Sequence, residues 1–215
     1  MTYDLSTKRV WLAGGQHLIS NSETPVLSDL WGWDGVRWTQ VSANTGSAMI
    51  THKLYVDGAG GLFAALSRGF VARWDGQRWN ALSPNTPSRR ESAAGAYDAQ
   101  RQQFVTFGGL VGGRAYDTTG ETWAFDGTRW SRIATTGPPA SLGGAMAYDT
   151  RRHVLVLVGG LDINGRKLPD MWEWTGTNWT RVSVAGPSPR FGAGIAYDQK
   201  RGETILFGGV NAARD

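Results

Sequence analysis

The chain has 215 residues, and its 22 lysines and arginines exceed its 18 acidic residues by only four. Arginines stand at equivalent points of successive repeats, as in Arg37, Arg78 and Arg129, so the positive charge is not gathered in the single face or run typical of nucleic-acid-binding proteins. The absence of cysteine excludes disulfides, thiolate metal sites and cysteine nucleophiles. No apolar run approaches the roughly 20 residues that a membrane-spanning helix needs. We therefore expect no nucleic-acid partner and no membrane span.

A Tyr-Asp dipeptide followed by a pair of glycines recurs along the chain, and each glycine pair begins eleven residues after the tyrosine. The four copies run from Tyr3 to Gly15, Tyr97 to Gly109, Tyr148 to Gly160 and Tyr197 to Gly209. A fixed pattern repeated at about fifty residues is typical of an architecture built by repetition of one supersecondary unit.

The fourth repeat is the clearest, and it reads as four strands, A to D, with expected ranges 143–148, 154–158, 171–174 and 179–182. The second of these, Val154–Val158, is aliphatic and β-branched throughout, which is typical of a strand buried on both faces. The polar turn 149–152 separates A from B, and the turn 175–178 separates C from D. The alternation of apolar runs and tight turns predicts an antiparallel sheet.

The hairpin between strands C and D recurs with two aromatic residues five positions apart: Trp33/Trp38, Trp74/Trp79, Phe125/Trp130 and Trp174/Trp179. Ten of the eleven tryptophans lie in strands C and D, and we expect them to fill the space between neighbouring sheets. Stacking of an exposed tryptophan on a sugar is the alternative role. Four-stranded units at this spacing predict an all-β fold, a β-propeller in which each unit is one blade.

The repeat resembles the kelch motif, in the tandem form common in bacterial proteins and similar to the central domain of galactose oxidase. The Gly-Gly pair, the tyrosine before the A–B turn and the spaced aromatics of the C–D hairpin carry the resemblance. It implies one propeller domain, 1–215, with blades at 1–43, 44–83, 84–133 and 134–183 and a partial blade at 184–215. The second repeat departs from the pattern, because it has Val56-Asp57 in place of Tyr-Asp, lacks Gly-Gly and joins B to C directly at Ser67–Gly69.

About four and a half repeats are present, because an A–B hairpin at 190–209 follows the fourth repeat. Propellers usually close by pairing strands from the two ends of the chain, and closure on four blades would leave the strand 204–207 redundant. We therefore expect an incomplete or open ring, belonging to a longer six- or seven-bladed protein, and self-association through an exposed edge strand. Residues 1–4 show no signal peptide, so the sequence does not assign a compartment.

Strand alternation places the A–B and C–D turns on one face and the B–C and D–A connections on the other. The turns are short and nearly constant, whereas the connections vary and include 16–28, 110–120 and 161–169. Because binding residues concentrate on variable loops held by a rigid scaffold, we expect the ligand to bind the face of the B–C and D–A connections.

On that face Arg90 and Arg190 hold the same repeat position, which Met49 and Ser141 occupy in two other blades. The kelch resemblance implies an arginine near the mouth of the central channel that binds acidic groups through its planar, bidentate guanidinium. A structural ion pair with an acid such as Glu91 is the alternative. The other candidate ligand-binding residues on these loops are Arg114, Arg166, Lys167 and His17, with Asp117, Asp162 and Asp170 near enough in sequence to neutralise the cations.

We expect no metal and no cofactor. His17 and His153 fall on opposite faces, and a metal site needs two or three converging ligands. The copper chemistry of galactose oxidase uses a tyrosine crosslinked to cysteine, which this chain lacks. No Ser/His/Asp order or phosphate loop stands out, and the recurring aspartates are turn residues.

Two functions from different classes follow from these observations. The first is a non-enzymatic recognition or scaffold module that binds a protein, peptide or glycan through the B–C and D–A connections. The second is a carbohydrate-active propeller, similar to the sialic acid mutarotases, acting at the channel mouth. Arginines without a carboxylate partner would favour the first, and an acid pair beside an exposed tryptophan would favour the second. A structural spacer without a ligand is a third possibility.

Overall fold

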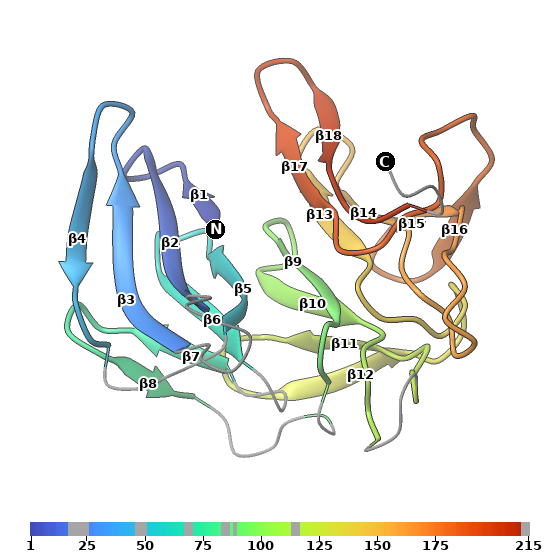
Figure 1. The fold of residues 1–215 in the computed structure, drawn as a ribbon, viewed down its shortest axis with the longest axis horizontal. Coiled ribbons are helices and arrows are strands. Elements are labelled where there is room, and N and C mark those ends of the chain that lie inside the picture. The colour runs from blue at the N-terminus through green and yellow to red at the C-terminus, as the bar shows by residue number, and fades with distance from the viewer. Residues whose placement is uncertain are drawn as a thin grey trace. The chain divides into compact units, whose positions relative to one another are not determined.

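The structure is a computed structural model of the 215-residue chain, and it describes residues 1–16, 26–45, 51–66, 71–82, 87, 90–112 and 117–211. The chain forms two compact units, Met1–Thr86 and Pro87–Asp215 (Figure 1). The assignment of 1–215 to a single domain stays a prediction. Strands and turns make up the described residues, and none of these residues forms a helix long and apolar enough to cross a membrane.

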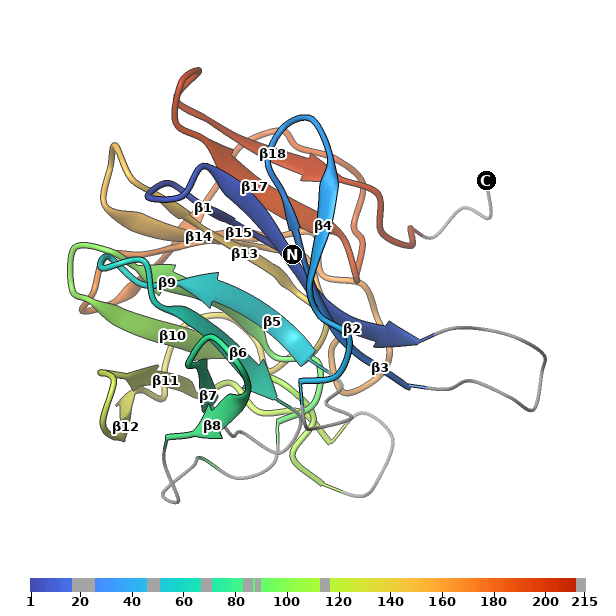
Figure 2. The same ribbon diagram turned by 90° about the vertical axis from the view of Figure 1, so that its left-hand side faces the viewer.

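The first unit contains two four-stranded antiparallel sheets, called blade 1 and blade 2 here. Blade 1 has the order β1 (Thr2–Asp4), β2 (Arg9–Gln16), β3 (Val26–Trp33) and β4 (Trp38–Ser42). Blade 2 has the order β5 (Thr51–Val56), β6 (Leu62–Leu66), β7 (Val71–Trp74) and β8 (Trp79–Ala81), and Figure 2 shows these strands following one another across the sheet. The second repeat therefore forms a full blade despite its divergent motifs. The expected B–C link at 67–69 lies outside the described residues.

The second unit contains blade 3, blade 4 and a two-stranded hairpin. Blade 3 comprises β9 (Ala94–Asp98), β10 (Gln103–Phe107), β11 (Thr122–Phe125) and β12 (Trp130–Ala134). Blade 4 comprises β13 (Ala145–Asp149), β14 (Val154–Val158), β15 (Met171–Trp174) and β16 (Trp179–Val182), and the hairpin pairs β17 (Gly194–Asp198) with β18 (Glu203–Phe207). Strands B, C and D of blade 4 have the predicted bounds. The predicted all-β class, with four four-stranded blades and half of a fifth, is confirmed.

Aromatic side chains fill the space between successive blades within each unit. Trp179 of blade 4 packs against Phe107 of blade 3, with ring centroids 5.5 Å apart, and its indole nitrogen donates to the hydroxyl of Thr122 at 2.8 Å. In the first unit, Trp79 of blade 2 lies in one buried cluster with Leu30 of blade 1. Since such rings bury a large apolar area, this contact holds one blade on the next.

The Gly-Gly motif is explained by the approach of the next blade. Gly159 has a φ of +68°, and a Cβ at this position would overlap the carbonyl oxygen of Arg190. The amide nitrogen of Gly160 donates to that same carbonyl at 2.9 Å. Gly108 and Gly109 relate to the carbonyl of Ser141 in the same way. The first glycine therefore supplies a left-handed conformation and open space, and the second supplies a hydrogen-bond donor.

Candidate functional site

The connections in the second unit lie on two faces, as the antiparallel order of each sheet requires. We call the face of the B–C connections 108–121 and 159–170 and the D–A connections 135–144 and 183–193 the loop face, with residues 113–116 outside the description. The opposite face, called the turn face, carries the short A–B turns and C–D turns.

Arg90 lies in the D–A connection that leads into blade 3, and it is buried, with a relative exposure of 4%. Its guanidinium forms an ion pair with Glu121 at the start of β11 and donates to the carbonyl oxygen of Gly108 at 3.2 Å. The guanidinium carbon also lies 5.6 Å from the ring centroid of Trp123. Among the described residues, the buried Nε has no hydrogen-bond partner. Arg90 thus has an acidic partner, and that acid is Glu121 rather than Glu91.

Glu121 joins three donors into one network. Besides Arg90, it accepts from the indole nitrogen of Trp123 at 2.9 Å and from Arg132 at 2.8 Å. The hydrogen bond from Trp123, helped by those from Arg132 and Arg90, outweighs burial and lowers the pKa of Glu121 to about 2. Glu121 is therefore ionised at neutral pH and has no proton to donate.

Arg190 holds the equivalent position before β17 but has different surroundings. It is half-buried, and its Nη1 donates to the carbonyl of Gly208 at 2.9 Å, as Arg90 does to Gly108. Its other nitrogens donate to the carbonyl and hydroxyl of Ser188 at 3.0 and 3.1 Å. Within the described part of the chain, Arg190 forms no ion pair.

Lys167 and Arg166 place two more cations on the loop face. The Lys167 ammonium lies 6.0 Å from the ring centroid of Phe191, next in sequence to Arg190, so this cation reaches the connection that carries Arg190. Arg166 is exposed. The nearby carboxylates are engaged elsewhere, because Asp162 accepts from the amides of Asn164 and Arg166 at 2.8 Å, and Asp170 pairs with Arg181. No ion pair to Arg166 or Lys167 occurs among the described residues.

Two predicted site residues, His17 and Arg114, lie outside the described residues. His153 ends the A–B turn of blade 4 with a φ of +58° and so lies on the turn face. Across 1–16, 26–45, 51–66, 71–82, 87, 90–112 and 117–211, no group of three His, Asp or Glu side chains is arranged to hold a metal ion.

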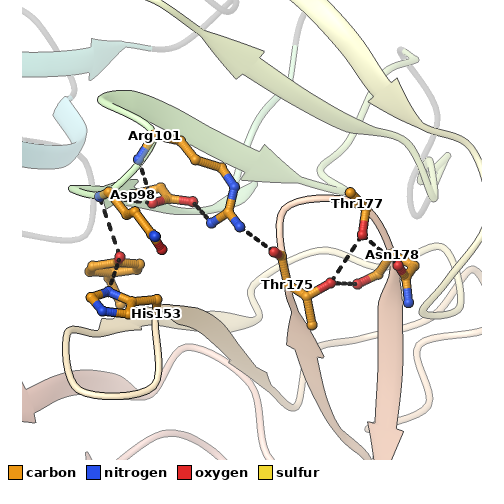
Figure 3. Close-up of polar contacts among 8 residues, drawn as sticks. Asp98, Arg101, His153, Thr175, Thr177 and Asn178 are labelled. Carbon is orange, nitrogen blue, oxygen red and sulfur yellow. Dashed lines mark hydrogen bonds and ion pairs between the residues drawn. The ribbon is translucent and has the colours of Figure 1, made fainter.

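The turn face holds a polar cluster that joins blade 3 to blade 4 (Figure 3). Asp98 accepts from Arg101 at 2.8 Å, and the same guanidinium reaches the carbonyl oxygen of Thr175 in the next blade. The hydroxyl of Tyr148 accepts from the amide of Gln100 at 3.3 Å and contacts Nδ1 of His153 at 3.2 Å. Burial, followed by the charge of Asp98, raises the pKa of Tyr148. These contacts give the Tyr-Asp motif a structural role between blades.

Sequence reasoning missed Glu121, although a repeated signal marks its position. An acid stands two residues before the first tryptophan of strand C in three blades, as Asp29, Glu121 and Asp170. In blade 1 the indole of Trp31 donates to Asp29 at 2.7 Å, and in blade 3 that of Trp123 donates to Glu121. In these two blades the acid-x-Trp pattern marks a local hydrogen bond, which in blade 3 extends to Arg90; in blade 4 the indole nitrogen of Trp172 has no hydrogen-bond partner among the described residues.

Comparison with known proteins shows the fold. No family model matches the sequence, and a search of curated proteins finds no match. Among solved structures, the chain is similar to the one described as the structure of YjhT, with a TM-score of 0.76, 14% identity and coverage of 98% of this chain and 76% of that one. A chain from a nidogen/laminin complex matches with a TM-score of 0.56, 16% identity and coverage of 93% and 68%. Together with the four-stranded blades, these similarities show that the protein has a β-propeller fold.

Proposed function

We propose that this propeller is a kelch-type recognition module without catalytic activity, which binds an acidic segment of a protein or peptide, or an acidic glycan, through the loop face. The observation that carries the proposal is the group of cations on the loop face: Arg166 is exposed, and Lys167 lies beside Phe191, the neighbour in sequence of the half-exposed Arg190. Arg90, by contrast, is buried and paired with Glu121. A half-exposed guanidinium is suited to bind a carboxylate through two hydrogen bonds.

The neighbouring residues support an anionic ligand. Lys167 adds positive charge beside the connection that carries Arg190, and Arg166 is an exposed cation next to Lys167 in sequence. Clustered cations raise the local concentration of acidic ligands. The backbone around Arg190 is held by the hydrogen bond between its carbonyl and Gly160, so the ligand would meet a fixed support. The fold itself is compatible with a protein partner, since a similar chain occurs in a nidogen/laminin complex.

The carbohydrate-active alternative needs an acid able to exchange a proton. The low pKa of Glu121, about 2, keeps it ionised, and its two oxygens are already bound by Trp123, Arg132 and Arg90. Asp170 is paired with Arg181. The low pKa of Glu121 and the ion pair of Asp170 favour recognition over acid catalysis on the loop face.

The proposal predicts that Arg190→Ala weakens binding of a fluorescein-labelled octaglutamate peptide by about 10- to 100-fold, because a charged hydrogen bond contributes about 1.5–3 kcal/mol. Fluorescence anisotropy at low salt measures the affinity, and a sialylated oligosaccharide serves as the acidic glycan probe. Arg129→Ala is the matched control, since it removes one exposed cation from a C–D turn, where Arg129 pairs with Asp126 at 3.6 Å. Equal losses in the two variants, or no loss in Arg190→Ala, would contradict the proposal.

A further inference from the structure

The guanidinium of Arg90 is held in blade 3 by three groups. Glu121 supplies a carboxylate, Gly108 supplies a carbonyl oxygen at 3.2 Å, and the ring centroid of Trp123 lies 5.6 Å from the guanidinium carbon. Arg132 binds the other oxygen of the same carboxylate at 2.8 Å. A guanidinium suits this arrangement because it donates to two acceptors in its plane while its face packs on an aromatic ring.

Blade 4 repeats these groups at the equivalent positions. Asp170 stands two residues before Trp172, and Gly159 begins the Gly-Gly pair. The amide nitrogen of Gly159 donates to the carbonyl oxygen of Asp170 at 3.4 Å, and the equivalent contact in blade 3 measures 3.2 Å. Arg181, at the repeat position of Arg132, binds one carboxylate oxygen of Asp170 at 2.5 Å. The segments that carry the acid and the carbonyl oxygen therefore lie side by side in both blades.

The arginine is the one member of the group that blade 4 replaces, because Ser141 occupies the position of Arg90. The chain follows the same course at this position in the two blades. A Cβ at Gly109 would lie 3.2 Å from the Cβ of Arg90. A Cβ at Gly160 would likewise lie 3.3 Å from the Oγ of Ser141. The serine side chain ends at this oxygen, so it is too short to reach the groups that the guanidinium contacts in blade 3.

The acceptors of blade 4 have free hydrogen-bonding capacity in the part of the chain that the structure describes. Arg181 binds one carboxylate oxygen of Asp170, and no donor among the described residues binds the other. Within the same residues no hydrogen bond reaches the carbonyl oxygen of Gly159, although the equivalent oxygen of Gly108 accepts from Arg90. The side chain of Asp170 is 21% exposed, so a ligand can approach it from solvent.

We propose that Gly159, Asp170 and Trp172 form a site, called the blade 4 site, that binds the guanidinium group of a ligand. The carboxylate of Asp170 and the carbonyl oxygen of Gly159 accept from this group, and its face packs on the ring of Trp172, as Arg90 does within blade 3. The site binds a cation and therefore does not rest on the recognition of an anion proposed above. A peptide that carries both an acid and an arginine would engage both sets of residues.

Titration with ethylguanidinium chloride tests the blade 4 site, with binding followed by the NMR signal of the Trp172 indole N–H in isotopically labelled protein. This nitrogen is buried and has no hydrogen-bond partner among the described residues, so its signal should respond to a cation placed on the ring. A ligand this small should bind with a Kd of about 1–10 mM. A Trp172 signal that stays unchanged up to about 50 mM would overturn the proposal.

Asp170→Asn should weaken the binding of ethylguanidinium by about tenfold or more, because the acceptor loses its charge. Asp126→Asn is the matched control, since it changes a carboxylate that pairs with an arginine at a C–D turn, and it should bind ethylguanidinium like the wild type. Equal affinities of Asp170→Asn and the wild type would contradict the assignment of Asp170 to the site.

Ser141→Arg places a guanidinium in the blade 4 site from within the chain. It should raise the melting temperature and abolish the binding of ethylguanidinium, whereas Ser141→Met, with a long side chain but no charge, should not raise the melting temperature. A folded Ser141→Arg variant that still binds ethylguanidinium like the wild type would overturn the proposal. If this variant does not fold, the comparison of Asp170→Asn with Asp126→Asn decides.

Two tripeptides, acetyl-Gly-Arg-Gly-amide and acetyl-Gly-Lys-Gly-amide, identify the source of the guanidinium group. Binding of the arginine peptide as tightly as ethylguanidinium would indicate a peptide ligand, and binding of ethylguanidinium alone would indicate a small guanidino compound. The lysine peptide should bind more weakly, because an ammonium cannot donate to two acceptors in one plane. Equal binding of the two peptides would overturn the assignment of the site to a guanidinium group.

Discussion

Glu121→Ala is expected to lower the free energy of unfolding by about 3 kcal/mol, because removal of one member of a buried ion pair leaves the other charge uncompensated. Arg90 is 4% exposed, and Glu121 is its carboxylate partner in the described chain. The substitution also removes the acceptor of Trp123 and Arg132. Urea unfolding followed by tryptophan fluorescence measures the loss.

Asp170→Ala is the matched control for this prediction. Asp170 lies at the equivalent position of blade 4, but Ser141 stands there in place of Arg90, and the partner Arg181 has a side chain that is 61% exposed. An exposed ion pair contributes at most about 1 kcal/mol, so the loss should be below that figure. Similar losses in the two variants would show that the burial of Arg90 does not determine how much unfolding free energy Glu121→Ala loses.

The same network predicts how stability depends on pH. The pKa of Glu121 is lowered from 4.5 to about 2 in the folded protein, so folding favours its ionised form. Its contribution to stability is therefore complete above about pH 5 and is lost as the pH falls from there toward 2. The difference in unfolding free energy between the wild type and Glu121→Ala should accordingly shrink over this range. A difference that stays constant down to pH 2.5 would contradict the assigned role.

The repeat motifs were sufficient to predict the blades, because the signals for them are local. A Tyr-Asp turn, an apolar strand and an aromatic hairpin each depend on neighbours in sequence, and blade 4 has strands B, C and D at the predicted residues. Even blade 2, without Gly-Gly, forms four strands. Its aromatic hairpin is retained, with the rings of Trp74 and Trp79 5.4 Å apart.

The environments of the two arginines could not be predicted from the sequence in the same way. Arg90 and Arg190 share a repeat position and a hydrogen bond to the carbonyl 18 residues later. The partner of Arg90 is Glu121, which lies 31 residues after it and reaches it because strand C of blade 3 pairs beside strand B. Contacts between segments so far apart depend on packing, and the spacing of residue types does not reveal them.

The second large effect on the free energy of unfolding is expected at a tryptophan that begins strand D. Trp179→Ala should cost about 4 kcal/mol, within the range for removing a buried tryptophan, because it opens a cavity beside Phe107 and leaves the Thr122 hydroxyl without its indole donor. Trp179→Phe should keep most of the ring contact and cost about 1–2 kcal/mol for the lost hydrogen bond. Urea unfolding measures both changes.

Trp38→Ala completes the comparison, because Trp38 occupies the same repeat position and packs against Trp33 in a tilted arrangement, at nearly the same distance as Trp179 from Trp174. For this variant the loss should stay below about 1 kcal/mol, as for most exposed substitutions. Both tryptophans make the contact within their own hairpin. The difference between the two losses of unfolding free energy therefore measures the contribution of packing one blade on the preceding one. Equal losses would show that the contact within the hairpin, and not the packing between blades, determines the loss of stability.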